Sequence, residues 1–167
     1  MKKVLSGLVL LLAVAAIAGT GGPTPKEAFE QLKKLVGTWE GAGEDAGKGM
    51  KVVYRLTGAG SALIETQLPG TPMEMVSVYH MDGPDLIMTH YCAAGNQPTM
   101  KYKSGKDGKS LDFDFLKGSN MKPTDMHIHA ARIRILSADS LESDWIGYNN
   151  GKPAGTETFK LKRASAK

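Results

Sequence analysis

Four histidines are the residues of this sequence best suited to chemistry, because imidazole binds metals, exchanges protons near neutral pH and forms hydrogen bonds. They are His80, His90, His127 and His129. Apolar residues flank each of them at intervals of two, which is the spacing of one face of a β-strand. The pattern predicts that all four side chains point to an apolar, inward face. His127 and His129 would then lie about 7 Å apart on one strand.

Three interpretations of these histidines stay open. In the first, they orient a small molecule in a largely apolar cavity, as a few polar groups do in most ligand pockets. The residues expected to contact that ligand are His90, His127, His129, Trp145, Tyr54, Asn96 and Gln97. In the second, three histidines bind a metal. In the third, they are structural and are satisfied by neighbouring hydroxyls and backbone groups.

The metal interpretation uses His90 together with the His127-x-His129 pair. Three imidazoles suit zinc with an open fourth position, whereas an added Cys or Met ligand would favour copper. Such a site would make the protein a metal carrier or a metal-dependent enzyme. No carboxylate is expected on the same face to serve as a general base. The serines lack nucleophile-elbow glycines, and no Gly-rich phosphate loop is present, so binding is favoured over catalysis.

Short β-strands must position these side chains, because apolar residues alternate with polar ones from residue 38 onward. Turn-forming Gly, Pro, Asn and Asp separate ten such segments. We expect an all-β fold, an antiparallel up-and-down β-barrel of about ten strands. The expected strands are 38–43, 50–57, 62–68, 74–80, 85–92, 99–103, 111–116, 126–136, 141–148 and 156–163.

One short helix precedes the strands. Thr24, Pro25 and Glu27 match a capping box with proline at the first helical position. Apolar residues follow at helical spacing up to Val36, and Gly37 fits the positive φ of a helix C-cap. We expect this helix to cover one end of the barrel.

The N-terminus predicts export. Lys2 and Lys3 precede an apolar run over residues 4–18 that ends in a small-x-small cleavage site. The predicted organisation is therefore a signal peptide at 1–18, a leader at 19–23 and one barrel domain at 24–167. The apolar run is short for a transmembrane helix, which needs about 20 residues, so we expect no membrane association after cleavage. The expected location is periplasmic or extracellular.

The charge distribution gives no nucleic-acid signal. The formal net charge is +4, and the lysines are spread through turns without interleaved aromatic residues. The expected partner is instead a small hydrophobic molecule.

The segment Gly37-Thr38-Trp39, after a short helix and before a meander of strands that ends near a basic residue, resembles the calycin barrels. These include lipocalins, fatty-acid-binding proteins and nitrobindin-like haem barrels. The resemblance implies a ligand-binding barrel in which Arg163 stacks on Trp39. The lipocalin Thr-Asp-Tyr motif is missing. Nitrobindin-like barrels ligate haem through a late histidine, and the last one here is His129, so the cofactor stays open between none, a metal ion and haem.

Strand alternation predicts where these residues fall along the barrel. Trp39 begins the first strand and Arg163 ends the last, so both should lie at one end together with His80. The other three histidines should then share the opposite, open mouth.

Overall fold

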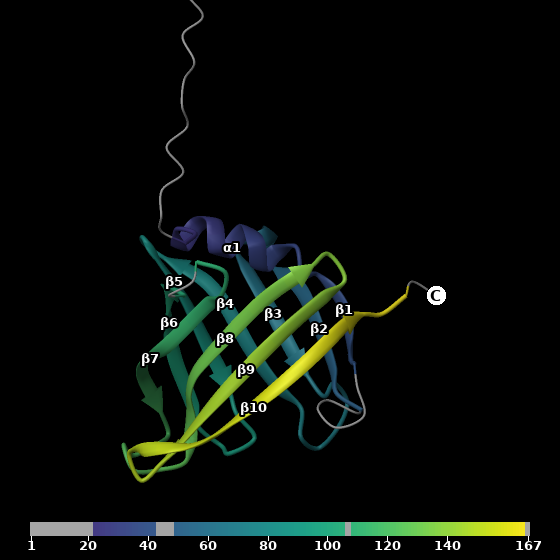
Figure 1. Cartoon of the computed structure of the whole chain (residues 1–167). Helices are drawn as coiled ribbons and strands as arrows, with labels where there is room; N and C mark the ends of the chain where they lie inside the picture. Colours follow the sequence, from purple (N-terminus) through teal and green to yellow (C-terminus); the bar gives the residue numbers. More distant parts are fainter. Residues whose placement is uncertain (1–21, 43–48, 106–107, 166–167) are drawn as a thin grey trace, which may run out of the picture.

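Ten antiparallel strands and one short helix make up the computed structural model over its described residues, 22–42, 49–105 and 108–165 (Figure 1). The predicted signal peptide lies outside these residues. No helix in the described ranges is long and apolar enough to cross a membrane. The elements are α1 (Pro25–Lys33), β1 (Gly37–Gly41), β2 (Lys51–Thr57), the 3-10 turn η1 (Gly58–Gly60), β3 (Ala62–Gln67), β4 (Met75–Asp82), β5 (Asp85–Tyr91), β6 (Gln97–Ser104), β7 (Leu111–Ser119), β8 (His127–Ser137), β9 (Ser140–Asn149) and β10 (Lys152–Arg163).

Each strand pairs with its neighbours in sequence, and β1 pairs with β10 to close the barrel. The closing register places Trp39 opposite Arg163. The predicted fold class, an all-β up-and-down barrel with a short N-terminal helix, is confirmed. Closure pairs the first strand with the last, which is how such barrels avoid edge-to-edge association, and β7 lacks a partner on β8 only beyond Asp114.

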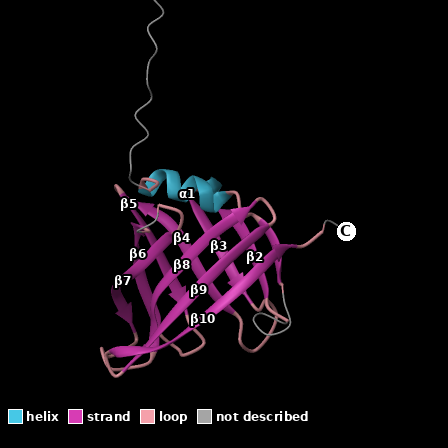
Figure 2. Cartoon of the chain, viewed as in Figure 1, coloured by secondary structure: helices cyan, strands magenta, loops and turns pink. Residues whose placement is uncertain are grey.

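Helix α1 lies across one end of the barrel, as Figure 2 shows. We call this the helix end and the opposite one the far end. The predicted capping box is present: the Thr24 backbone N–H donates to the Glu27 carboxylate at 2.8 Å, and the Thr24 hydroxyl accepts from the Glu27 N–H. The helix ends at Lys33 with Lys34 as its C-cap, so the prediction that Gly37 caps the helix is wrong; Gly37 has the expected positive φ, 131°, but begins β1.

Trp39 and Arg163 fasten the end of α1 to the barrel. The Arg163 guanidinium lies 4.4 Å from the centre of the Trp39 ring, as strand parity predicts. It donates to the carbonyls of Lys34 and Val36 at 3.0 and 2.8 Å. The Trp39 indole donates to the Leu35 carbonyl at 2.8 Å. The carbonyls that follow the helix are thus satisfied by side chains from β1 and β10.

Large apolar side chains fill the barrel interior near the helix end. Tyr79 and Phe113 meet edge to face, with ring centres 5.5 Å apart, and Met88 and Ile133 are also fully buried. Phe29 and the other apolar residues of α1 pack onto this core. Helix and barrel therefore share one hydrophobic core.

The predicted inward orientation of His80 is wrong. On β4 the fully buried residues are Ser77 and Tyr79, whereas Val78 and His80 are half-buried on the outer face. Near the far end, the inner face of this strand is more polar than its outer face. The apolar residues of β4 therefore predict the wrong face as the inward one. His80 does lie at the helix end, next to the turn into β5.

Candidate functional site

A row of polar side chains crosses the inner face of four neighbouring strands. Tyr54 of β2 lies opposite Glu65 of β3, Glu65 lies opposite Ser77 of β4, and Ser77 lies opposite His90 of β5. We call these four residues the lumen row. Each of them is at most 1% exposed. Polar groups buried this completely must find hydrogen-bond partners or cost stability.

Hydrogen bonds join two members of this row and tie Glu65 to its neighbours Tyr79 and Gln67. The Tyr79 hydroxyl donates to one oxygen of Glu65 at 2.5 Å, and the Gln67 amide donates to the other at 2.9 Å. The Ser77 hydroxyl and Nδ1 of His90 are 3.0 Å apart. The sequence-based statement that no carboxylate shares the face of the histidines is therefore wrong for His90, because Glu65 lies two strands away on the same inner face.

Burial controls the protonation of the lumen row. It raises the pKa of Glu65 above its ordinary value, against the lowering effect of the Tyr79 and Gln67 hydrogen bonds. It also raises the pKa of Tyr79, and the nearby carboxylate adds to that rise. For His90, burial lowers the pKa to about 4, so the ring is neutral at pH 7.

The lumen row continues across the interior to β9. The rings of His90 and Trp145 meet with their centres 4.9 Å apart, so these two predicted ligand residues contact each other. Nε2 of His90, Nε1 of Trp145 and the Tyr54 hydroxyl are buried without a hydrogen-bond partner among the described residues. Large side chains from opposite walls thus meet within the lumen.

His127 and His129 do not share the lumen with His90, because a β-bulge reverses the alternation of β8. Ile128 and Ala130 pair with consecutive residues of β9, which leaves His129 as the extra residue. Ile128 packs against the core. Adjacent residues of a regular strand point to opposite faces, so His127 points to the outer face, although its side chain is only 3% exposed. His129 is the bulged residue, and its contacts with the rings of His127 and Tyr148 place it on the same side. The prediction that they point inward is wrong.

The His129 ring lies between two aromatic rings. Its centre is 3.8 Å from that of Tyr148, at an interplanar angle of 14°, and 4.9 Å from that of Phe115, at 10°. The His127 ring also contacts Phe115, with centres 5.1 Å apart. The pairing of β7 with β8 ends at Asp114, so these rings occupy the place where the two strands separate.

A chain of hydrogen bonds fixes the two imidazoles. Nδ1 of His127 is 2.8 Å from the Asp125 carbonyl oxygen, which can only accept, so this nitrogen carries a proton. Nε2 of His127 is 3.0 Å from Nδ1 of His129. When both rings are neutral, His127 accepts at Nε2 and His129 donates from Nδ1. Nε2 of His129 then keeps its lone pair.

These rings border a hollow of about 320 Å³ in the barrel wall, which we call the wall pocket. Its volume lies at the lower end of the range of about 300–1,000 Å³ for ligand pockets, and its walls are mostly apolar and aromatic, as such pockets usually are. It is lined by Phe115, Gly118, Met121, Lys122, Pro123, His127, His129, Tyr148 and Gly151.

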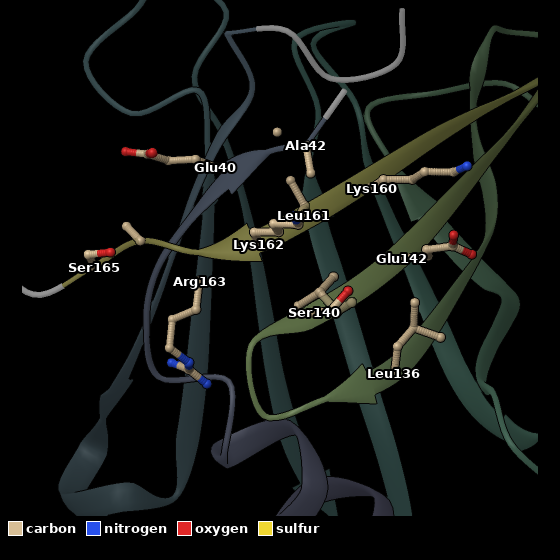
Figure 3. Close-up of a pocket in the computed structure, with 13 residues that line it drawn as sticks. Glu40, Ala42, Leu136, Ser140, Glu142, Lys160, Leu161, Lys162, Arg163 and Ser165 are labelled. Carbon is tan, nitrogen blue, oxygen red and sulfur yellow. The ribbon is translucent and has the colours of Figure 1, made fainter. Parts of the chain in front are cut away.

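A larger hollow of about 650 Å³ runs along the outer face of β1, β9 and β10 (Figure 3). Its lining includes Glu40, Glu142 and Lys160. In Figure 3 Glu40 points away from the other two, whereas Lys160 and Glu142, which lie opposite each other on β10 and β9, extend to the same side and carry opposite charges. A surface of this kind offers no convergent set of polar groups, so the wall pocket is the better candidate for ligand binding.

The side chains of Asn96 and Gln97 donate hydrogen bonds to backbone carbonyls in loops near the far end. The Asn96 amide donates to the Met126 carbonyl at 2.7 Å and anchors the start of β8. The Gln97 amide donates to the Gly95 carbonyl at 3.3 Å within its own turn. Neither residue lines the wall pocket.

A three-histidine metal site is not supported. Within residues 22–42, 49–105 and 108–165, no three His, Cys, Asp or Glu side chains are grouped to hold a metal ion. His90 faces the lumen and contacts Trp145, whereas His127 and His129 face the wall pocket. The β-sheet lies between His90 and the other two histidines, so the three predicted ligands do not converge.

Three residues of these clusters were missed by sequence reasoning. Glu65 alternates with Leu63 and Gln67, so strand parity alone places it on the inner face. Phe115 and Tyr148 could not be found in the same way, since their contacts with His129 depend on the bulge.

Comparison with known proteins supports the fold and does not extend to function. No protein-family model and no curated protein matches this sequence. The chain is similar to the crystal structure of Rv2717c from M. tuberculosis, with a TM-score of 0.53 and 20% sequence identity over 83% of this chain and 98% of that one. At this identity the similarity shows a shared β-barrel fold.

Proposed function

We propose that this protein binds a small, planar and largely apolar molecule in the wall pocket. The observation that carries the proposal is the aromatic stack of Phe115, His129 and Tyr148 beside a hollow of about 320 Å³. Ring faces and edges favour other planar rings by about 0.5–1.5 kcal/mol beyond the area that they bury. A planar ligand extends this stacking without disturbing the barrel.

The shape of the site supports a small ligand over a long one. Met121 and Pro123 provide apolar walls, and Lys122 is the charged side chain in the lining. Met adapts its shape to ligands of different outline, because its side chain is unbranched and flexible. The lumen, which large buried side chains occupy, does not serve as the cavity in this proposal.

We also propose that the protein acts outside the cytoplasm, as the basic and apolar segment at residues 2–18 suggests. Its partner would be a small hydrophobic molecule, with no role for nucleic acid or for membrane association after signal cleavage. The calycin-like architecture supports a carrier or sensor of such molecules.

The test uses naphthalene as an apolar planar probe, with binding measured by equilibrium dialysis and fluorescence. Tyr148→Ala removes one wall of the stack and should weaken naphthalene binding about 10-fold, from lost area and ring contact. Tyr91→Ala is the matched control, because Tyr91 is 51% exposed and does not line the pocket. No measurable binding to the wild type, or an equal loss in both variants, would contradict the proposal.

A further inference from the structure

The ring of His129 can offer only one edge to the wall pocket. Tyr148 and Phe115 cover its two faces at 3.8 and 4.9 Å. Its Nδ1 edge is taken by His127 at 3.0 Å. His129 nevertheless lines the pocket. The edge that remains carries Nε2, which has no hydrogen-bond partner among the described residues.

The hydrogen-bond chain decides what this edge presents. The Asp125 carbonyl fixes a proton on Nδ1 of His127, and that leaves Nε2 of His127 to accept from His129. A neutral imidazole carries one N–H and one lone pair. Because His129 donates from Nδ1, its Nε2 is an acceptor. The Asp125 carbonyl and the His127 ring thus determine that His129 presents an acceptor to the pocket.

The other nitrogen-bearing side chains that line the pocket offer no free acceptor. Lys122 only donates, and both nitrogens of His127 are already engaged. The Tyr148 hydroxyl belongs to the ring that stacks on His129. Burial and the neighbouring His127 lower the pKa of His129, so this ring is neutral at pH 8 and the acceptor form applies there.

We propose, building on the function proposed above, that the wall pocket selects aromatic molecules that carry a hydrogen-bond donor, as phenols do, and that Nε2 of His129 accepts this donor. The aromatic ring lies in the apolar part of the pocket. The hydroxyl points to the exposed edge of His129. His127 is a positioning residue, because it acts by holding the tautomer of its neighbour.

The test compares three probes of one ring system at pH 8: 2-naphthol, 2-methoxynaphthalene and naphthalene. A net hydrogen bond is worth about 0.5–1.5 kcal/mol, which corresponds to roughly 2- to 10-fold in affinity. We expect 2-naphthol to bind tighter than both analogues by this factor. In His129→Phe, which keeps a flat ring in the stack, 2-naphthol and 2-methoxynaphthalene should bind equally well.

A second measurement needs no variant. In ¹⁵N-labelled protein at pH 8, long-range ¹H–¹⁵N spectra report directly whether each imidazole nitrogen carries a proton. We expect Nε2 of His129 to be unprotonated, and its resonance to move with 2-naphthol and to stay in place with 2-methoxynaphthalene. A protonated Nε2 in the free protein would show that the chain runs in the opposite direction and would overturn the inference.

The outcomes separate the two proposals. Equal binding of all three probes to the wild type would leave a planar apolar site in place and refute the role of Nε2. Absence of binding for every probe would refute the pocket itself, and the selectivity for donors would fall with it.

Discussion

Replacing Arg163 by Ala should destabilise the protein by about 3 kcal/mol. Its guanidinium donates to the carbonyls of Lys34, Val36 and Ala138 at 2.8–3.0 Å and stacks on Trp39. Hydrogen bonds to a charged group contribute about 1.5–3 kcal/mol each, and a cation–π contact about 0.5–2. These contributions all come from one guanidinium, and the side chain is 27% exposed. The expected destabilisation is therefore well below the sum of the separate contributions.

The assay is thermal and urea unfolding followed by circular dichroism. For a chain of this size each kcal/mol corresponds to about 2–4 °C, so Tm should fall by roughly 6–12 °C. Arg163→Lys keeps the charge but loses the fork of donors, and should recover about a third of the loss. The matched control is Asp139→Asn, since Asp139 is 79% exposed and lies 3.5 Å from Arg163. This surface pair should contribute less than about 1 kcal/mol.

An Arg163→Ala variant that loses less than about 1 kcal/mol would refute the reasoning. The guanidinium would then not be the group that fastens the end of α1 to the first and last strands. A loss as large in Asp139→Asn would point instead to the surface ion pair.

Three further predictions concern the lumen row and the bulge. Burial lowers the pKa of His90 from 6.5 to about 4, so its contribution to stability is present above pH 6.5 and is lost as the pH falls through 4. The free energy of unfolding of the wild type should therefore fall by about 3 kcal/mol between pH 7 and pH 4, and His90→Gln should not show this fall. The same pH dependence for both proteins in urea unfolding would count against this prediction. Burial raises the pKa of Glu65 above 4.5, so the wild type should lose stability as the pH rises through the folded value, by at most about 1.4 kcal/mol per pH unit; in Glu65→Gln this slope should be absent from the same titration. Deleting His129 should remove the bulge, leave His127 opposite Tyr148 and abolish the ring stack on Tyr148, with loss of naphthalene binding in the dialysis assay; unchanged binding would show that the bulge residue does not shape the pocket.

Local and short-range features were predictable from the sequence. The capping box of Thr24 and Glu27 depends on residues three positions apart, and the positive φ of Gly37 on one residue type. The contact between Trp39 and Arg163 follows once the strands are counted and alternated. Each of these inferences needs only the strand count and the chemistry of single residues.

The inward orientation of His90 was predicted correctly, whereas the orientations of His80, His127 and His129 were not predictable in the same way. Alternation extends from one residue to the next only while the strand is regular, and the bulge at His129 breaks it without an obvious sequence signal. His80 was misplaced for a different reason: the lumen is polar where Ser77 and Glu65 cross it, so hydropathy assigns the wrong inner face. A polar interior also explains why Glu65 was overlooked.

The position of the wall pocket has a consequence for the rate of ligand exchange. A ligand held inside a closed barrel leaves only when strands or loops part, and such motions set its residence time. The wall pocket lies where β7 and β8 separate, so no strand pair needs to open. Its occupant would exchange directly with solvent, and affinity alone would set its lifetime. Such a protein would follow changes in ligand concentration promptly and would store little.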